Sequence, residues 1–343
     1  MRDIRLDRLR TIAVFGIVMI HAFYRTGYFE IVPELSVGWL GGMAAYTMAF
    51  PMTNVFVIIS SYFLIDGTFQ WKRVRELLLP TATFSLVLYL LTAALGAAGF
   101  SPVELLECVL SPLVNQYWFV SAYIILYILS PYLNRALGAL KRQELKRLCL
   151  ILLVVFCILP TFLIFEPVQS LFDAKNGKGI LWFVTIYVMT FYLKRYGDHF
   201  LKIKNYVLYL TGVGSAVLLI GSHVVLKWLS TMLGMESDGA ARLYFDSSAF
   251  VALISFILFI LTLKQKKTAG GKFWSRLAQA SLTVYLIHEP PAVKQILWYA
   301  VRERIEQSPS LAFLIVVCAG TAVCVVCLAA DGLYRKLQRK VIK

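Results

Sequence analysis

Charged residues are scarce in this sequence, and acidic ones especially so. Asp, Glu, Lys and Arg make up 15% of the 343 residues, and 19 residues are acidic, whereas roughly a quarter of a typical soluble domain is charged. Hydrophobic residues make up 59%, and the mean hydropathy is +0.73. Apolar runs long enough to cross a bilayer recur with short connectors between them. This pattern argues against a soluble protein and predicts an all-α integral membrane protein.

Several motifs that carry chemistry are also absent. The sequence has no P-loop, no GxGxxG, no GxSxG elbow and no HExxH pair, which argues against the nucleotide, dinucleotide, hydrolase and zinc-protease sites that these motifs build. The six cysteines lie in or beside apolar stretches, and the CxxC formed by Cys324 and Cys327 lies within an apolar run. We therefore predict neither a disulfide framework nor a metal site.

The net charge of +15 is distributed in a way that indicates membrane orientation. Basic residues cluster at both ends of the chain and in every second connector between apolar runs, whereas the other connectors are poor in Lys and Arg and carry acids such as Glu30 and Glu34. The positive-inside rule then predicts that both termini are cytoplasmic and that the number of spans is even. No nucleic-acid partner is expected, because the basic residues form no continuous patch in the sequence.

The apolar runs predict a bundle of about ten transmembrane helices that forms a single domain over residues 1–343. The predicted helices cover about 8–28, 44–65, 76–98, 117–134, 147–165, 179–193, 205–226, 244–263, 278–300 and 311–333.

The first apolar run contains two ionisable residues, Arg10 and His21, which are costly in hydrocarbon. They are eleven positions apart, so on an α-helix they point within roughly 20° of each other and lie about 16 Å apart along the axis. The pair predicts a polar path into the membrane. Arg10 would lie near its cytoplasmic mouth, and His21 past the midplane toward the outside.

Each of these residues has a functional and a structural interpretation. A neutral imidazole at His21 can take a proton from a hydroxyl and return it, or it can be a buried histidine bonded to a neighbouring helix. Arg10 can bind a phosphate or a carboxylate, or it can be one more cytoplasmic anchor paired with Asp7. The residues alone leave both alternatives open.

Two later segments offer further candidate groups. His288 and Glu289 stand just ahead of a Pro-Pro pair, which predicts a broken helix that either lines a cavity or merely changes direction. Tyr117 and Trp118 fall at the predicted outer interface, where aromatic residues either anchor the helix in the membrane boundary or stack on a sugar ring.

Four segments together resemble acyltransferase family 3, a family of integral membrane O-acyltransferases. The run LDRLRTIAVFGIVMIHAF resembles the opening of that family, in which ten residues separate an Arg from a His and an acidic residue precedes the Arg. Arg10, His21 and Asp7 match these three positions. NVFVIISSYFLI, YWFVSAYIILYILSPYLNR and SLTVYLIHE resemble later segments of the family in the same order.

The resemblance implies an enzyme that moves an acyl group, usually acetyl, from cytoplasmic acyl-CoA to a hydroxyl of a cell-envelope carbohydrate or its lipid-linked precursor. Acetyl-CoA would be the donor substrate, and no cofactor is expected to be permanently bound. With the polar groups above, the expected site residues are His21 and Arg10 for catalysis, Arg10 and Asp7 for acyl-CoA, and Tyr117, Trp118, His288 and Glu289 for the acceptor.

The expected location is a bacterial plasma membrane, which the chain crosses several times. The expected partners are the lipid bilayer, the carbohydrate or lipid-linked glycan, and other proteins of envelope biosynthesis. A transporter or exporter of a polysaccharide precursor is the alternative from another class, because it would use the same polar helices to line a translocation path. The two differ in what a His21 variant would lose: the acyl group, or the surface glycan itself.

Overall fold

The structure is a computed structural model that describes residues 3–96, 99–112, 117–162, 177–234, 243–267 and 271–341. All regular secondary structure within these ranges is helical, as the sequence predicts. The described helices are α1 (Ile4–Arg25), α2 (Tyr28–Ile31), α3 (Val37–Ala49), α4 (Met52–Leu64), α5 (Trp71–Ala94), α6 (Pro102–Val109), α7 (Trp118–Ala139), α8 (Arg142–Leu153), a π-helical turn (Val154–Ile158), α9 (Leu159–Phe162), α11 (Ile180–Tyr196), α12 (Asp198–Leu201), α13 (Asn205–Met232), α14 (Ala249–Lys264), α15 (Lys272–Gln279), α16 (Ser281–His288), α17 (Pro291–Gln307), a 3-10 turn (Pro309–Leu311) and α18 (Ala312–Val341).

Each of the ten predicted segments contains a described helix, but two of them are broken. The segment predicted at about 44–65 consists of α3 and α4, which meet at Phe50 and Pro51. The carbonyl of Pro51 accepts a hydrogen bond of 3.1 Å from Ser255 Oγ in α14, so a neighbouring helix supports the break. The segment predicted at about 278–300 consists of α16 and α17, which are separated at the Pro-Pro pair.

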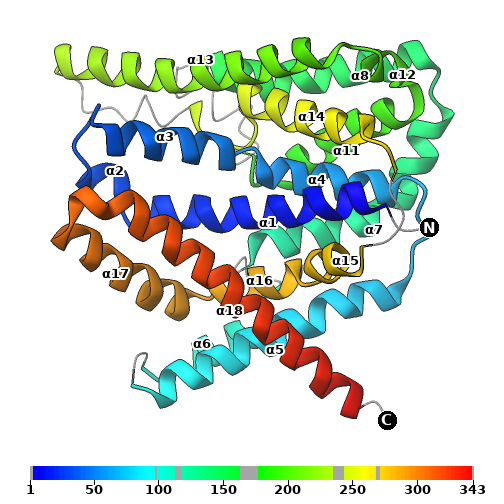
Figure 1. Cartoon of the computed structure of the whole chain (residues 1–343). Coiled ribbons are helices and arrows are strands. Elements are labelled where there is room, and N and C mark those ends of the chain that lie inside the picture. Colours follow the sequence, from blue (N-terminus) through cyan, green and yellow to red (C-terminus); the bar gives the residue numbers. More distant parts are fainter. Residues whose placement is uncertain are drawn as a thin grey trace.

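Helix α1 runs through the middle of the bundle and contacts α3, α4, α15 and α18 (Figure 1). Two glycines permit this close packing. A Cβ atom at Gly16 would lie 2.5 Å from Cγ of Met52 in α4, and one at Gly320 in α18 would lie 2.6 Å from Cε of Met19 in α1. Small residues at such contacts let membrane helices approach each other without cavities.

The start of α1 is fixed by Asp3 and Arg5. The Asp3 carboxylate accepts from the backbone N–H of Arg5 at 3.1 Å and caps the helix, and it also accepts from the Arg5 side chain at 2.7 Å. Arg5 in turn donates to the carbonyls of Leu263 and Gln265, both at 2.6 Å. Asp3 precedes the helix, and the neighbouring guanidinium holds the pKa of its carboxyl below the ordinary value.

Five helical segments among the described residues are long and apolar enough to cross a membrane. They are Val37–Leu64, Trp71–Ala94, Arg142–Phe162, Asn205–Met232 and Pro309–Lys336. Helix α1 is not among them because every stretch of 18 residues within it carries at least three charged side chains. The count of ten spans stays a prediction.

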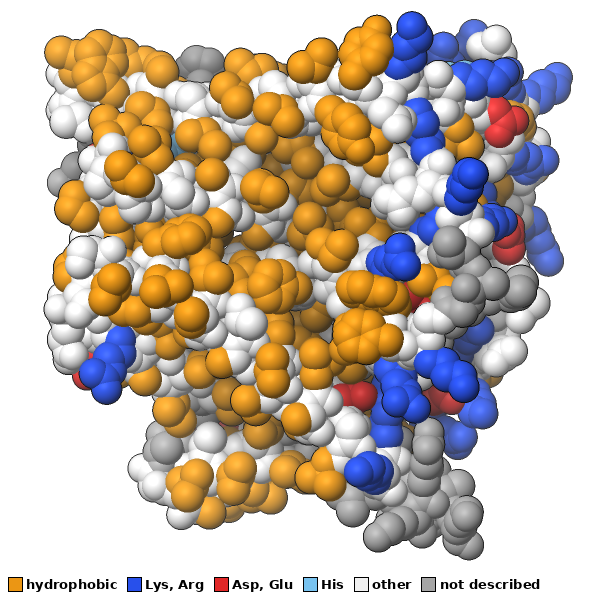
Figure 2. All heavy atoms as spheres, in the orientation of Figure 1, with side chains coloured by type: hydrophobic (Ala, Val, Ile, Leu, Met, Phe, Trp, Pro, Cys, Tyr) orange, Lys and Arg blue, Asp and Glu red, His pale blue; other side chains and the backbone are white. Residues whose placement is uncertain are grey.

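Both chain ends lie on the same side of the molecule (Figure 1). Lys and Arg side chains gather mostly on that side in the space-filling view, whereas hydrophobic side chains cover the rest of the visible face (Figure 2). This asymmetry is the one that the positive-inside rule associates with a cytoplasmic side. It supports the predicted orientation of the termini, which stays a prediction.

Candidate functional site

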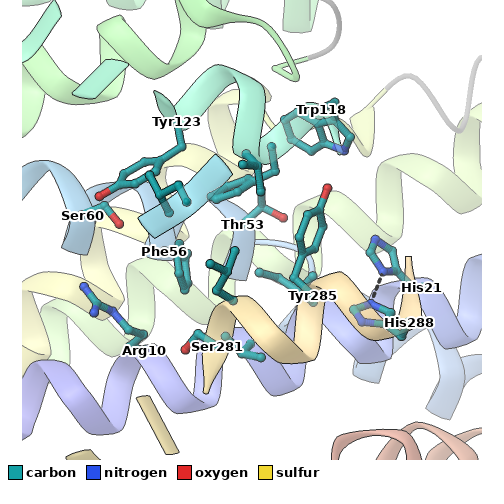
Figure 3. Close-up of a pocket in the computed structure, with 16 residues that line it drawn as sticks. Arg10, His21, Thr53, Phe56, Ser60, Trp118, Tyr123, Ser281, Tyr285 and His288 are labelled. Carbon is teal, nitrogen blue, oxygen red and sulfur yellow. Dashed lines mark hydrogen bonds between the residues drawn. The ribbon is translucent and has the colours of Figure 1, made fainter. Parts of the chain in front are cut away.

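A cavity of about 150 Å³ lies among α1, α4, α5, α7 and α16. Arg10 and His21 both line it, which confirms that the two share one face of α1. They stand at opposite ends of the cavity, with Phe56 and Thr53 of α4 and Tyr285 of α16 between them (Figure 3).

The His21 end of the cavity is a compact cluster of hydrogen-bonded ionisable groups. His21 Nδ1 lies 2.9 Å from His288 Nε2 and 2.9 Å from Glu289 Oε1. Arg25, one turn further along α1, places Nη2 at 2.9 and 3.0 Å from the two oxygens of Glu289. His288 and Glu289 are nearly inaccessible, at 1% and 4% exposed. A buried carboxylate needs such partners, because an unpaired charge in a low dielectric is strongly destabilising.

These contacts assign the hydrogens on both imidazoles in their neutral forms. His288 Nδ1 lies 2.6 Å from the carbonyl oxygen of Val284, and since a carbonyl only accepts, Nδ1 carries the hydrogen and Nε2 is an acceptor. His21 Nδ1 therefore faces two acceptors, His288 Nε2 and Glu289 Oε1, and must be the donor. The lone pair of His21 is then on Nε2, so Nε2 is the atom that can accept a proton as a base.

The break after α16 brings these groups to α1 and explains the position of Tyr117. In a continuous helix, the carbonyl of Leu286 would accept from the N–H of residue 290, but Pro290 has none. The hydroxyl of Tyr117 donates to that carbonyl instead, at 3.1 Å. Tyr117 is fully buried and does not line the cavity, so the structure places it as a support for α16. The neighbouring Trp118 does line the cavity.

The Arg10 end of the cavity is built from aromatic rings and hydroxyl groups. The guanidinium carbon of Arg10 lies 5.6 Å from the ring centre of Phe56 and 5.8 Å from that of Phe63. Such contacts favour a cation by its attraction to the face of the ring. Ser60 and Tyr123 also line this end (Figure 3).

Asp7 lies outside the cavity. It is 5% exposed, and its Oδ2 accepts from Ser275 Oγ of α15 at 2.8 Å. The structure therefore places Asp7 at the contact between α1 and α15. The sequence resemblance assigns it to acyl-CoA binding. Its assignment to acyl-CoA binding stays a prediction.

Several residues that line the cavity or contact its ionisable cluster were not singled out from the sequence, although some carried a signal. Arg25 follows His21 by four positions and so lies on the same face of α1. Thr53 and Ser60 are seven positions apart, which again gives one helix face, and both line the cavity. Ser281 and Tyr285 line it from α16, and only the packing of that helix against α1 identifies them.

The same cluster has the geometry to hold a metal ion. One ligand atom each from His21, His288 and Glu289 lie within 4.8 Å of one another, and a two-histidine, one-carboxylate set suits several transition metals. However, Arg25 contacts both oxygens of Glu289, so an added cation would face a guanidinium. We therefore interpret the cluster as a hydrogen-bonded support for His21.

An ionisable cluster beside a cavity between apolar helices defines the class of protein as a helical bundle with a reactive or binding site in its interior. A family model described as an acyltransferase domain, that of acyltransferase family 3, matches residues 3–329. The chain belongs to this family, so it is a membrane acyltransferase in general terms. Searches of curated proteins and of solved structures gave no match.

Proposed function

We propose that this protein transfers an acyl group, usually acetyl, from cytoplasmic acyl-CoA to a hydroxyl of a cell-envelope carbohydrate or its lipid-linked precursor. The observation that carries this proposal is the hydrogen-bond pattern at His21. Its Nδ1–H is occupied by His288 and Glu289, which leaves Nε2 as the base in a cavity that extends to Arg10. Family membership supports the acyl transfer itself.

In the proposed reaction the acceptor hydroxyl attacks the thioester carbonyl while His21 Nε2 takes the hydroxyl proton. The tetrahedral intermediate collapses as the carbon–sulfur bond breaks, and the imidazolium returns the proton to the leaving CoA thiolate. Glu289 stabilises the positive charge that His21 carries between these steps, and Arg25 holds Glu289 in place. The products are the O-acyl ester and free CoA.

Arg10 would bind the donor at the other end of the cavity. Its forked donors suit the phosphates of CoA, or it could orient the thioester oxygen. Arg10 is nearer than His21 to the start of α1. That start lies on the side of the N-terminus (Figure 1), where Lys and Arg side chains gather (Figure 2). A cytoplasmic donor would therefore meet Arg10 first, and the acceptor would approach from the His21 end, where Trp118 offers an aromatic face.

Replacing His21 by Ala tests this function against the export alternative. We expect mass spectrometry of envelope carbohydrate to show loss of the acyl group, by roughly 10²- to 10⁴-fold in rate because general base catalysis is removed, while the unmodified glycan still reaches the surface. His199→Ala is the matched control, because His199 is exposed in α12 and outside the cavity. Unchanged acyl content with normal expression, or loss of the glycan itself, would contradict the proposal.

A further inference from the structure

A second cavity, separate from the first, lies between the turn before α3 and the last turns of α13. It has a volume of about 340 Å³, and its walls include Glu34 and Trp39 on one side and Lys227 and Trp228 on the other. The start of α3 and the end of α13 lie on the side of the molecule opposite the two termini (Figure 1). None of these residues takes part in the proposed acyl transfer.

One wall of this cavity includes a residue whose buried side-chain donor has no partner among the described residues. Trp39 is 2% exposed, and its Nε1–H makes no hydrogen bond within the described part of the chain. An indole N–H can only donate, and buried donors are nearly always paired with protein, water or ligand. An acceptor group of a molecule in the cavity would satisfy this donor.

An ion pair spans the mouth of the same cavity. Lys227 of α13 contacts the carboxylate of Glu34 from the turn before α3, and both side chains are about half exposed, at 47% and 48%. A positive and a negative group held side by side, and still accessible, match a ligand that carries both charges close together. A neutral ligand would gain little from this arrangement.

The surroundings of the cavity indicate that its ligand comes from the lipid phase. Helix α13 is long and apolar enough to cross a membrane, and most of its surface faces outward. Val225 and Trp228, which line the cavity, are 53% and 59% exposed. Trp and Lys near the end of a span are typical of the membrane–water boundary, where the ring lies at headgroup level and the ammonium reaches water.

We propose that this cavity binds the headgroup of a zwitterionic, ammonium-bearing phospholipid. The phosphate accepts from the Trp39 indole and the Lys227 ammonium, and the ammonium of the lipid pairs with Glu34. The glycerol and the first part of the chains lie against Val225 and Trp228. The site does not depend on the proposed acyl transfer.

Lipid retention by the full-length protein tests this site. The protein is reconstituted in vesicles of phosphatidylethanolamine and phosphatidylglycerol, extracted in mild detergent, and analysed by native mass spectrometry. We expect wild type to retain the ethanolamine lipid. Trp39→Phe keeps the ring and removes the donor, and Lys227→Gln removes the charge, so each should lower occupancy roughly fivefold or more, as for the loss of one hydrogen bond to a charged group.

Glu34→Gln tests the charge complementarity. Without the carboxylate, the preference for the ethanolamine lipid over the glycerol lipid should disappear while total retention persists. Trp71→Phe and Lys72→Gln are matched controls on the exposed start of α5, and they should behave as wild type.

Retention and preference unchanged in all three cavity variants would overturn the proposal. A soluble oligosaccharide that displaces the lipid from wild type but not from Trp39→Phe would overturn it too, since the cavity would then be a sugar site. If Trp39→Phe does not fold, Lys227→Gln and Glu34→Gln still test the proposal. Both of these side chains are half exposed, so their replacement should not prevent folding.

Discussion

The two ends of the main cavity hold their ionisable groups in different ways. At one end, His21 is fixed by hydrogen bonds to two groups of a distant segment, and these are fixed in turn by Arg25 and a backbone carbonyl. At the other end, the contacts of Arg10 include the ring faces of Phe56 and Phe63. Hydrogen bonds define direction and tautomer, whereas a ring face attracts a cation with little directional preference.

This difference matches the chemistry proposed for each end. A base that moves a proton must present one nitrogen in one orientation, so its partners must be rigid. A group that binds a flexible, highly charged donor needs charge more than a fixed angle. We therefore expect substitutions at the His21 end to lower kcat and those at the Arg10 end to raise KM for acyl-CoA.

Among the variants that test this comparison, Glu289→Gln should have the largest effect. It keeps the size of the side chain but removes the charge that supports the His21 imidazolium, so kcat should fall by roughly 10²-fold or more, as when the carboxylate of other histidine bases is neutralised. KM for acyl-CoA should change little. Steady-state assays of the purified protein in detergent, with acyl-CoA varied, give the two constants separately.

The variant Glu289→Asp is the control for a purely structural role. It restores the charge on a shorter side chain and should recover part of kcat. If Glu289→Gln retains wild-type kcat, or if the two variants lose activity and folding equally, Glu289 does not position the base.

Arg10→Ala should have the next largest effect, and this effect should be on KM for acyl-CoA. Removing a guanidinium that binds phosphate should raise KM for acyl-CoA by roughly 10- to 100-fold, the value of one hydrogen bond between charged groups. The same assays check this result, with Arg10→Lys expected to be intermediate because an ammonium keeps the charge and loses the fork. A fall in kcat at unchanged KM would place Arg10 at the reacting carbonyl instead.

Phe56→Leu should produce a smaller change in the same direction. Leucine fills much of the volume without the ring face, and a cation–π contact is worth about 0.5–1 kcal/mol at an accessible site, so KM should rise roughly two- to fivefold. Phe100→Leu is the control, since Phe100 is exposed and outside the cavity. Equal KM values for both variants and wild type would show that the ring does not hold Arg10 for the donor.

Asp3→Asn should affect stability alone. Asn still caps a helix, so the change removes the charge that faces Arg5, at a cost of about 1 kcal/mol. Because the folded pKa of Asp3 is lowered, its contribution is present above the ordinary value of 3.8 and is lost as the pH falls through the lower folded value. Thermal unfolding in detergent should thus show less acid destabilisation for Asp3→Asn than for wild type, and identical pH profiles would contradict this.

Much of the local structure follows from the sequence because hydrophobic runs and helical periodicity are local properties. Each of the ten predicted segments contains a described helix, and the helical repeat placed Arg10 and His21 on one face, as the cavity confirms. The Pro-Pro pair after Glu289 marked the real break between α16 and α17. In contrast, the break between α3 and α4 was missed, because a segment with one proline is compatible with a continuous apolar span.

The partners in the site could not be predicted in the same way. His288 is 267 positions from His21, and neither segment contains a pattern that indicates a contact between the two residues. Tyr117 had the pattern of a boundary aromatic but supports the freed carbonyl of Leu286, and Asp7 lies against α15 rather than in the cavity. These outcomes depend on how distant helices pack.

The sequence by itself determined the apolar helices, the polar face of α1 and the family. The helices follow from composition, the polar face from residue spacing, and the family from the motifs. The tertiary structure alone decided which nitrogen of His21 is free, because that depends on acceptors supplied by α16 and the residue after it. It also decided that Arg25 and Glu289 form one unit with His21. The reason is that a tautomer and an ion pair are properties of groups brought within hydrogen-bond distance, and the packing of α1 against α16 brings these groups together.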